Sequence, residues 1–431
     1  MNRFDALEDA LGLKVPAILF PKEGTDLKKW AVIACDQYTS QPDYWNEVEK
    51  LVGDAPSTLR LILPEIYLET SDEEARIAAI REHMKAYLSE GVFTALPEGA
   101  VLLRRTALSK SRLGLVVSLD LEAYDFAPGS SSPIRATEKT IVERIPPRLR
   151  IRRGAPIELP HILVLIDDPN RTVLEPLENL DSSSAPLLYD TDLMMGGGHV
   201  TGHFIPKESL LPALEALLAL KEKTGVLYAV GDGNHSLATA KAAWEEIKPT
   251  LSEEERKTHP ARFALCELEN IHDPGIVFEP IHRVIFGSDQ LSGHEMLLRL
   301  SVILSEQNGE VRITPKTTDE FNPSAMKLHF QTGSEYGMLE IENPSKTLEV
   351  AVLQEAIDRL LAETGVKIDF IHGEEAVAEL CKDEHNLGFY LPAMDKFKLF
   401  PAVAKDGALP RKTFSMGHAE EKRYYMEAKR I

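Results

Sequence analysis

The stretch YAVGDGNHSLATAKAAWEE, residues 228–246, constrains the fold more than any other part of the sequence. An apolar run ends at the glycine-flanked Asp232, and good helix formers follow Asn234 and His235. This order predicts a buried strand, a tight turn and a helix. Helix N-termini favour anions, and the flanking glycines would let a ligand approach the backbone. Alternatively, Asp232 or Asn234 only caps the helix while His235 makes a structural hydrogen bond.

Apolar runs on both sides of this junction predict a mixed sheet with covering helices. Strands are expected at 31–35, 58–69, 100–108, 112–126, 161–169, 226–230, 262–270 and 282–286. Helices are expected from about residue 40, over 71–91 with Ser71 and Glu74 as a capping box, over 207–225 and over 236–247. The short polar turn before residue 112 indicates an antiparallel pair, so the expected fold class is α/β to α+β.

The pattern changes after about residue 290, where short strand-like runs alternate with two amphipathic helices. We therefore expect three parts. They are a main mixed α/β domain over 1–288, a smaller α+β subdomain over 289–375, and a C-terminal segment, 376–431, that packs back on the main domain.

Charge and composition exclude several classes of protein. Asp and Glu number 68 against 48 Lys and Arg, and the net charge of −20 would repel a nucleic-acid backbone. No signal-peptide pattern and no run of about 18 apolar residues is present, so neither secretion nor a membrane partner is expected. Cys35, Cys266 and Cys381 lack metal-type spacing and fit a reducing cytoplasm. The sequence leaves a homodimer open.

The proline-rich segment 127–160 is long for a simple connection. Its cations are Arg135, Lys139, Arg144, Arg148, Arg150, Arg152 and Arg153. In an acidic chain such a cluster could bind a phosphorylated ligand, although alternating apolar residues within 148–153 are also typical of a solvated edge strand. Glu138 could act as a general base toward a hydroxyl if it is buried, or it could be a surface acid in an ion pair.

Three further stretches contain candidate side chains. GGGHVTGHF, with His199 and His203, is not a zinc-protease motif and predicts a glycine-rich lid or an ordinary loop. EPIHRVIF places His282 and Arg283 beside a strand, where they would reach a ligand or form surface ion pairs. LPRKTFSMGH offers Lys412 to a phosphate, with a solvated tail as the alternative. The P-loop and the nucleophile elbow are both missing from the sequence.

Taken together, six segments resemble the landmarks of the bacterial domain-of-unknown-function 1015 (DUF1015) family, in the family's order and across nearly the whole chain. They are ACDQYTS, STLRLILPE, IRATEKT, GDGNHSLATAKA, PIHRVIF and LPRKTFSMGH. That family is similar to the ParB and sulfiredoxin-like fold, whose box is a strand, a turn of the type D-G-H-H-R and a helix. The resemblance implies such a core here. Free serine kinases with this box use it to bind nucleotide phosphates and a metal ion, with a nearby Glu as base toward the serine hydroxyl.

In this chain the box reads DGNHS, with Asn234 in place of the first His and Ser236 in place of the Arg. Without that Arg, the charge for a phosphate would have to come from Arg135, Arg283 or Lys412. An amide at Asn234 excludes the thiol chemistry of sulfiredoxins. A DNA-partitioning role would need a recognition module and a basic surface, and neither is visible.

The turn and the resemblance together predict a small-molecule phosphotransferase that acts between ADP or ATP and a hydroxyl substrate, with free serine or phosphoserine as the best candidate. The predicted roles are phosphate binding by Gly231, Gly233, Asn234, Ser236, Arg135, Lys139, Arg283 and Lys412; Mg²⁺ binding and catalysis by Asp232; charge stabilisation by His235; proton acceptance by Glu138; and substrate binding by Asp36, His199 and His282. The alternatives are a nucleotide-binding regulator without catalysis and a phosphatase of a phosphorylated metabolite.

Overall fold

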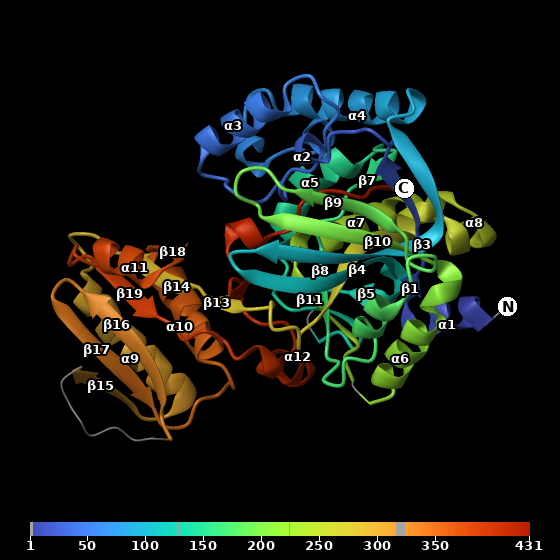
Figure 1. Ribbon diagram of the computed structural model, residues 1–431. Coiled ribbons are helices and arrows are strands. Elements are labelled where there is room, and N and C mark those ends of the chain that lie inside the picture. The colour runs from blue at the N-terminus through green and yellow to red at the C-terminus, as the bar shows by residue number, and fades with distance from the viewer. Residues whose placement is uncertain (1–2, 128, 224, 316–323) are drawn as a thin grey trace. The chain divides into compact units, whose positions relative to one another are not determined.

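The computed structural model describes residues 3–127, 129–223, 225–315 and 324–431, and the account below concerns these residues. The chain divides into two compact units (Figure 1). The first comprises Met1–Val277 and Met416–Ile431, and the second comprises Phe278–Ser415. The sequence places boundaries instead at residues 288 and 375. The difference arises because β14 (His282–Phe286) pairs with β18 (Lys367–Ile371) and β19 (Asn386–Tyr390) in one sheet.

A large mixed sheet forms the centre of the first unit, and it confirms the predicted mixed α/β class. Its strand order is β5-β6-β11-β8-β12-β4-β3-β10-β9, with β1 added on β4 and β2 on β3. The strands are β1 (Leu13–Lys14), β2 (Ala17–Pro21), β3 (Phe93–Ala107), β4 (Lys110–Asp120), β5 (Tyr124–Asp125), β6 (Ile134–Ala136), β8 (Leu163–Ile166), β9 (Leu187–Asp192), β10 (His199–Pro206), β11 (Tyr228–Asp232) and β12 (Phe263–Asn270). β3 and β4 form the predicted antiparallel pair, whereas β11 runs parallel to β6.

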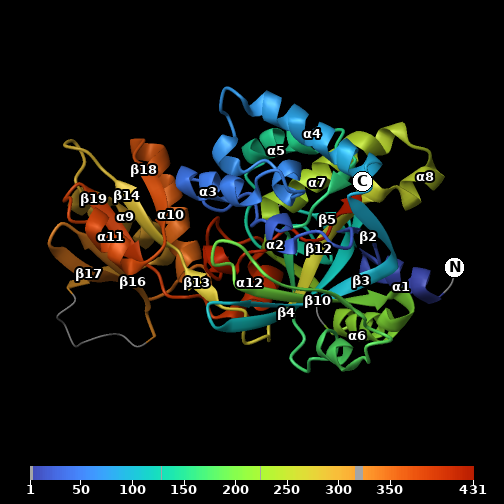
Figure 2. The ribbon, with the colours of Figure 1, turned by 45° about the horizontal axis from the view of Figure 1, so that its top comes forward.

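Two apolar cores lie on opposite faces of this sheet, because successive side chains of a strand point to opposite sides. In β3, Leu102 belongs to the core that also contains Leu214 and Trp244, and Val101 belongs to the core that contains Trp45 and Ile80. The helices of the unit are α1 (Arg3–Leu11), α2 (Leu27–Trp30), α3 (Pro42–Val52), α4 (Glu73–Ser89), α5 (Ile145–Arg152), α6 (Leu211–Lys221), α7 (Asn234–Ile247) and α8 (Glu253–Thr258). Figure 2 shows α5 lying beside α7.

The C-terminal residues complete the first unit. β21 (Lys429–Arg430) pairs with β7 (Ile157–Glu158), and the backbone of Tyr425 bonds to that of Val32. The last residues of the chain therefore pack in the same apolar core as residues from its N-terminal half.

The second unit contains an antiparallel sheet of order β15-β17-β16-β19-β14-β18. Its remaining strands are β15 (Val311–Pro315), β16 (Met326–Thr332) and β17 (Glu335–Ile341), and its helices are α9 (Gly293–Asn308), α10 (Glu349–Thr364), α11 (Glu374–Leu380) and α12 (Leu399–Asp406). A short pair, β13 (Phe278–Pro280) and β20 (Phe414–Met416), contains the residues at which the chain enters and leaves this unit.

Two strand predictions near the N-terminus are wrong. Residues 31–35 form no continuous strand, because their only ladder pairing is a single bridge between Ile33 and Tyr424. Other backbone groups of this stretch bond to Leu27, Thr58 and Glu65. Residues 58–69 form two short 3₁₀ turns, Thr58–Leu61 and Glu65–Tyr67. The first of these follows Ser57, whose hydroxyl accepts the Leu59 N–H and so starts a turn rather than a strand.

Three further expectations are corrected. The capping box at Ser71 does not form, because α4 begins at Glu73 after Asp72. Residues 148–153, for which an edge strand was an alternative, lie in or just after helix α5. His199 and the residues after it in the predicted lid lie in strand β10, which pairs with β3 and, with a register shift between Gly202 and His203, with β9. None of the helices in the described ranges combines the length and apolar character needed to cross a bilayer.

Candidate functional site

The predicted strand, turn and helix form as β11, Gly233 and α7. Gly233 is the N-cap residue and has φ of 80°, a left-handed conformation that favours glycine. Gly231 serves packing rather than ligand approach, since a Cβ there would lie 2.1 Å from the Met416 Sδ. The first backbone N–H groups of α7 have no partner within the helix by geometry, so the turn retains the predicted capacity for an anion.

The segment that follows β6 is held against this turn. β6 and β11 pair in parallel, which carries residues 137–141 to the start of α7. The Thr137 N–H donates to Asn234 Oδ1 over 3.1 Å, and Asn234 Nδ2 donates to Thr137 Oγ1 over 3.2 Å. The Ile141 N–H donates to His235 Nε2 over 3.3 Å. Glu138 is half-buried and lies in the sequence between these two anchored positions.

Asp232 is paired with a cation that the sequence did not indicate. Lys422 Nζ lies 2.9 Å from Asp232 Oδ2, and the Gly233 N–H donates to Oδ1 over 2.9 Å. Burial opposes ionisation of Asp232, but the attraction of Lys422 prevails and lowers the pKa of the carboxyl below its ordinary value.

These contacts do not suit Asp232 to hold Mg²⁺. Both of its oxygens are engaged, and Mg²⁺ prefers one or two available carboxylates together with phosphate oxygens and water. Within the described residues, no group of three or more His, Cys, Asp and Glu side chains is arranged to hold a metal ion. The predicted role of Asp232 as a metal ligand is therefore not supported by its surroundings.

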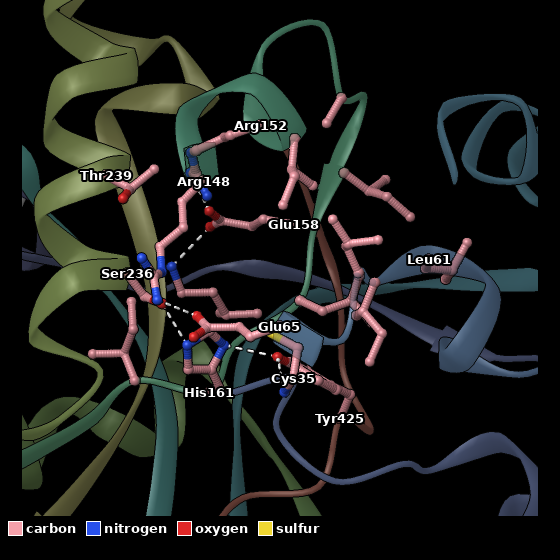
Figure 3. A pocket seen from close by; sticks show the side chains of 18 of the residues that line it. Cys35, Leu61, Glu65, Arg148, Arg152, Glu158, His161, Ser236, Thr239 and Tyr425 are labelled. Atoms are coloured by element: carbon pink, nitrogen blue, oxygen red, sulfur yellow. Dashed lines mark hydrogen bonds and ion pairs between the residues drawn. The ribbon is translucent and has the colours of Figure 1, made fainter. Parts of the chain in front are cut away.

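A cavity of about 140 Å³ adjoins the first turn of α7 (Figure 3). Most of its wall is aliphatic, supplied by Leu61, Ile62, Leu63, Leu68, Met84, Ile151, Ala155, Ile157, Leu159, Ile162 and Leu265. The polar side chains gather at one end and come from α5, α7, the 3₁₀ turn at residue 65 and the C-terminal segment. The cavity thus joins an apolar space to a cluster of charged and hydroxyl groups.

His161 lies at the centre of the polar end. Its Nε2 contacts the hydroxyl of Ser236, and its Nδ1 lies 2.8 Å from the hydroxyl of Tyr425. The Cys35 N–H donates to the same Tyr425 hydroxyl over 3.1 Å. Burial raises the pKa of the Cys35 thiol and of the Tyr425 phenol, so both remain protonated at neutral pH.

An ion pair between Arg148 and Glu65 closes this end of the cavity. Burial raises the pKa of Glu65, Arg148 opposes that shift, and the negative charge of Asp36 reinforces it. Asp36, which the sequence predicts to bind substrate, therefore lies within electrostatic range of Glu65. His161 also lowers the pKa of both Glu65 and Asp232, which shows that one imidazole lies within electrostatic range of the cavity and of the turn.

Other predicted residues near the turn have defined positions. Arg135 is half-buried on β6, and its Nε donates to the carbonyl of Ser132 over 2.5 Å. Lys139 is exposed in the anchored segment beside Glu138. Of the two residues, Lys139 is the more exposed.

His199 is not brought to the turn. It lies on β10, five strands from β11 in the sheet order. Its Nδ1 is 2.9 Å from Asp192 Oδ1 and its Nε2 is 2.5 Å from Asp190 Oδ1. These contacts describe a surface ion-pair cluster.

His282, Arg283 and Lys412 belong to the second unit. Arg283 is fully buried and donates to the carbonyls of Arg411 and Lys412, so its guanidinium supports the chain locally. His282 is buried as well and accepts the Leu391 N–H at Nδ1. These contacts fix strand β14 and give no observation of a phosphate site.

Sequence reasoning missed His161, Glu65, Tyr425 and Lys422. His161 directly precedes the apolar run of β8, and because β8 runs antiparallel to β11, the start of β8 lies beside the turn that follows β11. Tyr425 and Lys422 offered no comparable signal, since they come from the last residues of the chain.

Comparison with protein families identifies the chain. The family model described as "Protein of unknown function (DUF1015)" matches residues 17–411. Because this match covers most of the 431 residues, the chain belongs to that family, and the resemblance of its landmarks is confirmed. No curated protein matches the sequence.

Several solved structures are similar to this chain at low sequence identity. A conserved hypothetical protein from Pyrococcus furiosus is 10% identical, with a TM-score of 0.37, over 76% of this chain and 97% of that one. A free serine kinase in complex with AMP is 10% identical, with a TM-score of 0.38, over 73% and 87%. SbnI with C-terminal truncation from Staphylococcus aureus is 9% identical, with a TM-score of 0.37, over 73% and 82%.

Proposed function

We propose that this member of the DUF1015 family is a small-molecule phosphotransferase that moves a phosphoryl group between an adenine nucleotide and a hydroxyl substrate. The observation that carries the proposal is the anchoring of residues 137–141 to α7 by the Thr137–Asn234 and Ile141–His235 hydrogen bonds. It keeps Glu138 beside a helix N-terminus. A carboxylate base next to an anion-binding helix end supplies the two groups that transfer to a hydroxyl needs.

The phosphates would lie at the first turn of α7. The backbone N–H groups there and the positive end of the helix dipole favour a polyanion, and Lys422 adds a full charge at Asp232. The buried hydroxyl of Thr140 makes no hydrogen bond within the described residues. Because buried hydroxyl groups are rarely left without a partner, a polar ligand at this place is expected to supply one.

His235 would stabilise negative charge on a phosphate oxygen, and Glu138 would remove the proton of the attacking hydroxyl. His235 accepts the Ile141 N–H at Nε2, so a hydrogen bond to a phosphate oxygen would come from Nδ1. Glu138 would accept the proton of the attacking hydroxyl while the oxygen forms its bond to phosphorus and the nucleotide leaves with the old P–O electrons. Free serine or phosphoserine remains our substrate candidate, and we assign Asp36 to bind its ammonium group.

The described residues offer no group of three or more side chains for Mg²⁺. A nucleotide that arrives as its magnesium complex would bring the ion with it. Asp232 then acts by fixing Lys422 beside the phosphates rather than by coordinating metal.

The test is phosphoryl transfer followed by phosphorus NMR, with Mg²⁺, ADP or ATP, and serine or phosphoserine. Glu138→Gln should lower kcat by about 100-fold or more and leave nucleotide affinity unchanged, because it removes the base without altering the phosphate site. The matched control is Glu246→Gln, at the other end of α7, where the carboxylate pairs with the exposed Arg153. It should retain full activity.

Other outcomes would replace the proposal. Nucleotide binding without turnover of any hydroxyl amino acid would favour a regulator. Phosphate release from phosphoserine without nucleotide would favour a phosphatase. Full activity of Glu138→Gln would remove the assigned base.

A further inference from the structure

We propose that Ser236 is the nucleophile of a second, acyl-transfer activity, with His161 as its base and Tyr425 as the residue that orients His161, and that its substrates are esters of short aliphatic acids. This inference goes beyond the proposed phosphotransferase and does not depend on it. It rests on the side chains at the polar end of the cavity in Figure 3.

The contacts form a continuous chain of hydrogen bonds. Tyr425 Oη accepts the Cys35 N–H and lies 2.8 Å from His161 Nδ1. The Tyr425 hydroxyl also hydrogen-bonds the Cys35 side chain. We assign the imidazole proton to Nδ1, with Tyr425 as its acceptor, which leaves Nε2 as an acceptor for the Ser236 hydroxyl. A nucleophile bonded to a base that a third group orients is the arrangement that activates a serine.

Ser236 also occupies a favourable place on α7. It is the third residue of the helix, so its hydroxyl lies near the first backbone N–H groups and the positive end of the dipole. Attack on a carbonyl places negative charge on the former carbonyl oxygen. Backbone N–H groups near that oxygen stabilise such charge, as in an oxyanion hole.

The cavity indicates the class of substrate. Its aliphatic wall favours a hydrocarbon chain, and its volume of about 140 Å³ is close to that of an engineered cavity that holds benzene. The charges at the polar end are already paired, Arg148 with Glu65 and Arg152 with Glu158. A short acyl chain therefore suits this mostly apolar space better than a phosphoryl group.

The reaction balances without a cofactor. Ser236 Oγ forms a bond to the carbonyl carbon while its proton passes to His161 Nε2. The ester C–O bond then breaks, and the leaving alkoxide takes the proton from His161. Water repeats the sequence, giving the free acid and restoring Ser236.

The experiment uses the full-length protein and an alkyl fluorophosphonate. Ser236 Oγ should attack phosphorus and expel fluoride, and intact mass spectrometry with peptide mapping should place one phosphonyl group on Ser236. Hydrolysis of p-nitrophenyl butyrate, without nucleotide, is measured in parallel. His161→Gln, which keeps a polar side chain but removes the base, should slow both reactions by about 100-fold or more.

Ser183→Ala is the control, because that hydroxyl is exposed and bonded to Asp181. It should label and turn over like the unaltered protein, whereas Ser236→Ala should do neither. Absence of label on the unaltered protein, or label on Cys35 or Tyr425 instead, would overturn the assignment, and this readout does not depend on any variant folding. Phosphoryl transfer without labelling would leave the proposed function standing alone.

Discussion

At the scale of single residues, the neighbours of His199 determine the pKa of its side chain. Its hydrogen bond to Asp192 raises the pKa of the imidazole, partial burial opposes the shift, and Asp190 adds to it. A pKa raised in the folded state stabilises the protein below about pH 6.5, the value of an unfolded His, and this stabilisation disappears as the pH rises through the folded value. Because the side chain is 43% exposed, solvent screening limits the effect to about 0.5 kcal/mol.

His199→Gln should therefore lower the free energy of unfolding by about 0.5 kcal/mol at pH 6 and leave it unchanged at pH 9. Urea denaturation at the two pH values measures the difference. Asp192→Asn removes the principal partner and should give the same pH dependence. An equal loss at both pH values would mean that His199 contributes packing rather than charge.

Residues of the candidate site could be predicted from the sequence where they lie close together in it. Asp232, Asn234 and His235 stand out because glycines, a helix start and polar groups coincide within one turn. The pairing of His161 with Tyr425 was not predictable, because 264 positions separate the two residues and no periodic pattern links them. Local turn chemistry identifies the place of the site, whereas its partners depend on the tertiary fold.

At the scale of elements, α5 determines how the anchored segment meets α7. Pro146 and Pro147 occupy its first turn, where proline favours a helix, and Leu149 packs with Ala238 and Ala243 of α7.

Leu149→Ala should lower the free energy of unfolding by about 3 kcal/mol, since it removes a buried side chain and leaves a cavity. Urea denaturation tests this. Val142→Ala, at a position 61% exposed just before α5, should change stability by less than about 0.5 kcal/mol.

Elements were predictable where apolar periodicity and helix signals agree. β11 with α7, the β3–β4 pair, and α9 and α10 all follow this rule. Predictions failed where tertiary context decides between conformations. Residues 58–69 are apolar enough for a strand, but Ser57 and Pro64 start turns there. Strand β10 contains a glycine, yet it is paired with a strand on each side. Local propensity is a weak guide at such places.

At the scale of the whole molecule, the first unit is discontinuous in sequence. Residues 416–431 complete a core that begins near residue 18, whereas the sequence predicts that a longer segment, 376–431, packs back on the main domain. Ion pairs help to join the C-terminal segment to the sheet. Arg423 pairs with Glu267 of β12 and, over 2.6 Å, with Glu427. All three side chains are at most 3% exposed. Arg423 and Arg112 lower the pKa of Glu267 against the effect of burial.

Arg423→Met should therefore destabilise the first unit by about 3–5 kcal/mol, because it leaves buried carboxylates with too few cations. The same change at Arg359, whose ion pairs are exposed, should cost less than about 1 kcal/mol. Adding Glu427→Gln to Arg423→Met should restore part of the loss, since it removes one uncompensated charge. Chemical denaturation of the three variants measures these differences. If the double variant is no more stable than Arg423→Met alone, Arg423 joins the C-terminal segment to the sheet mainly by packing, and the site residues Lys422 and Tyr425 are held in place by the apolar core instead.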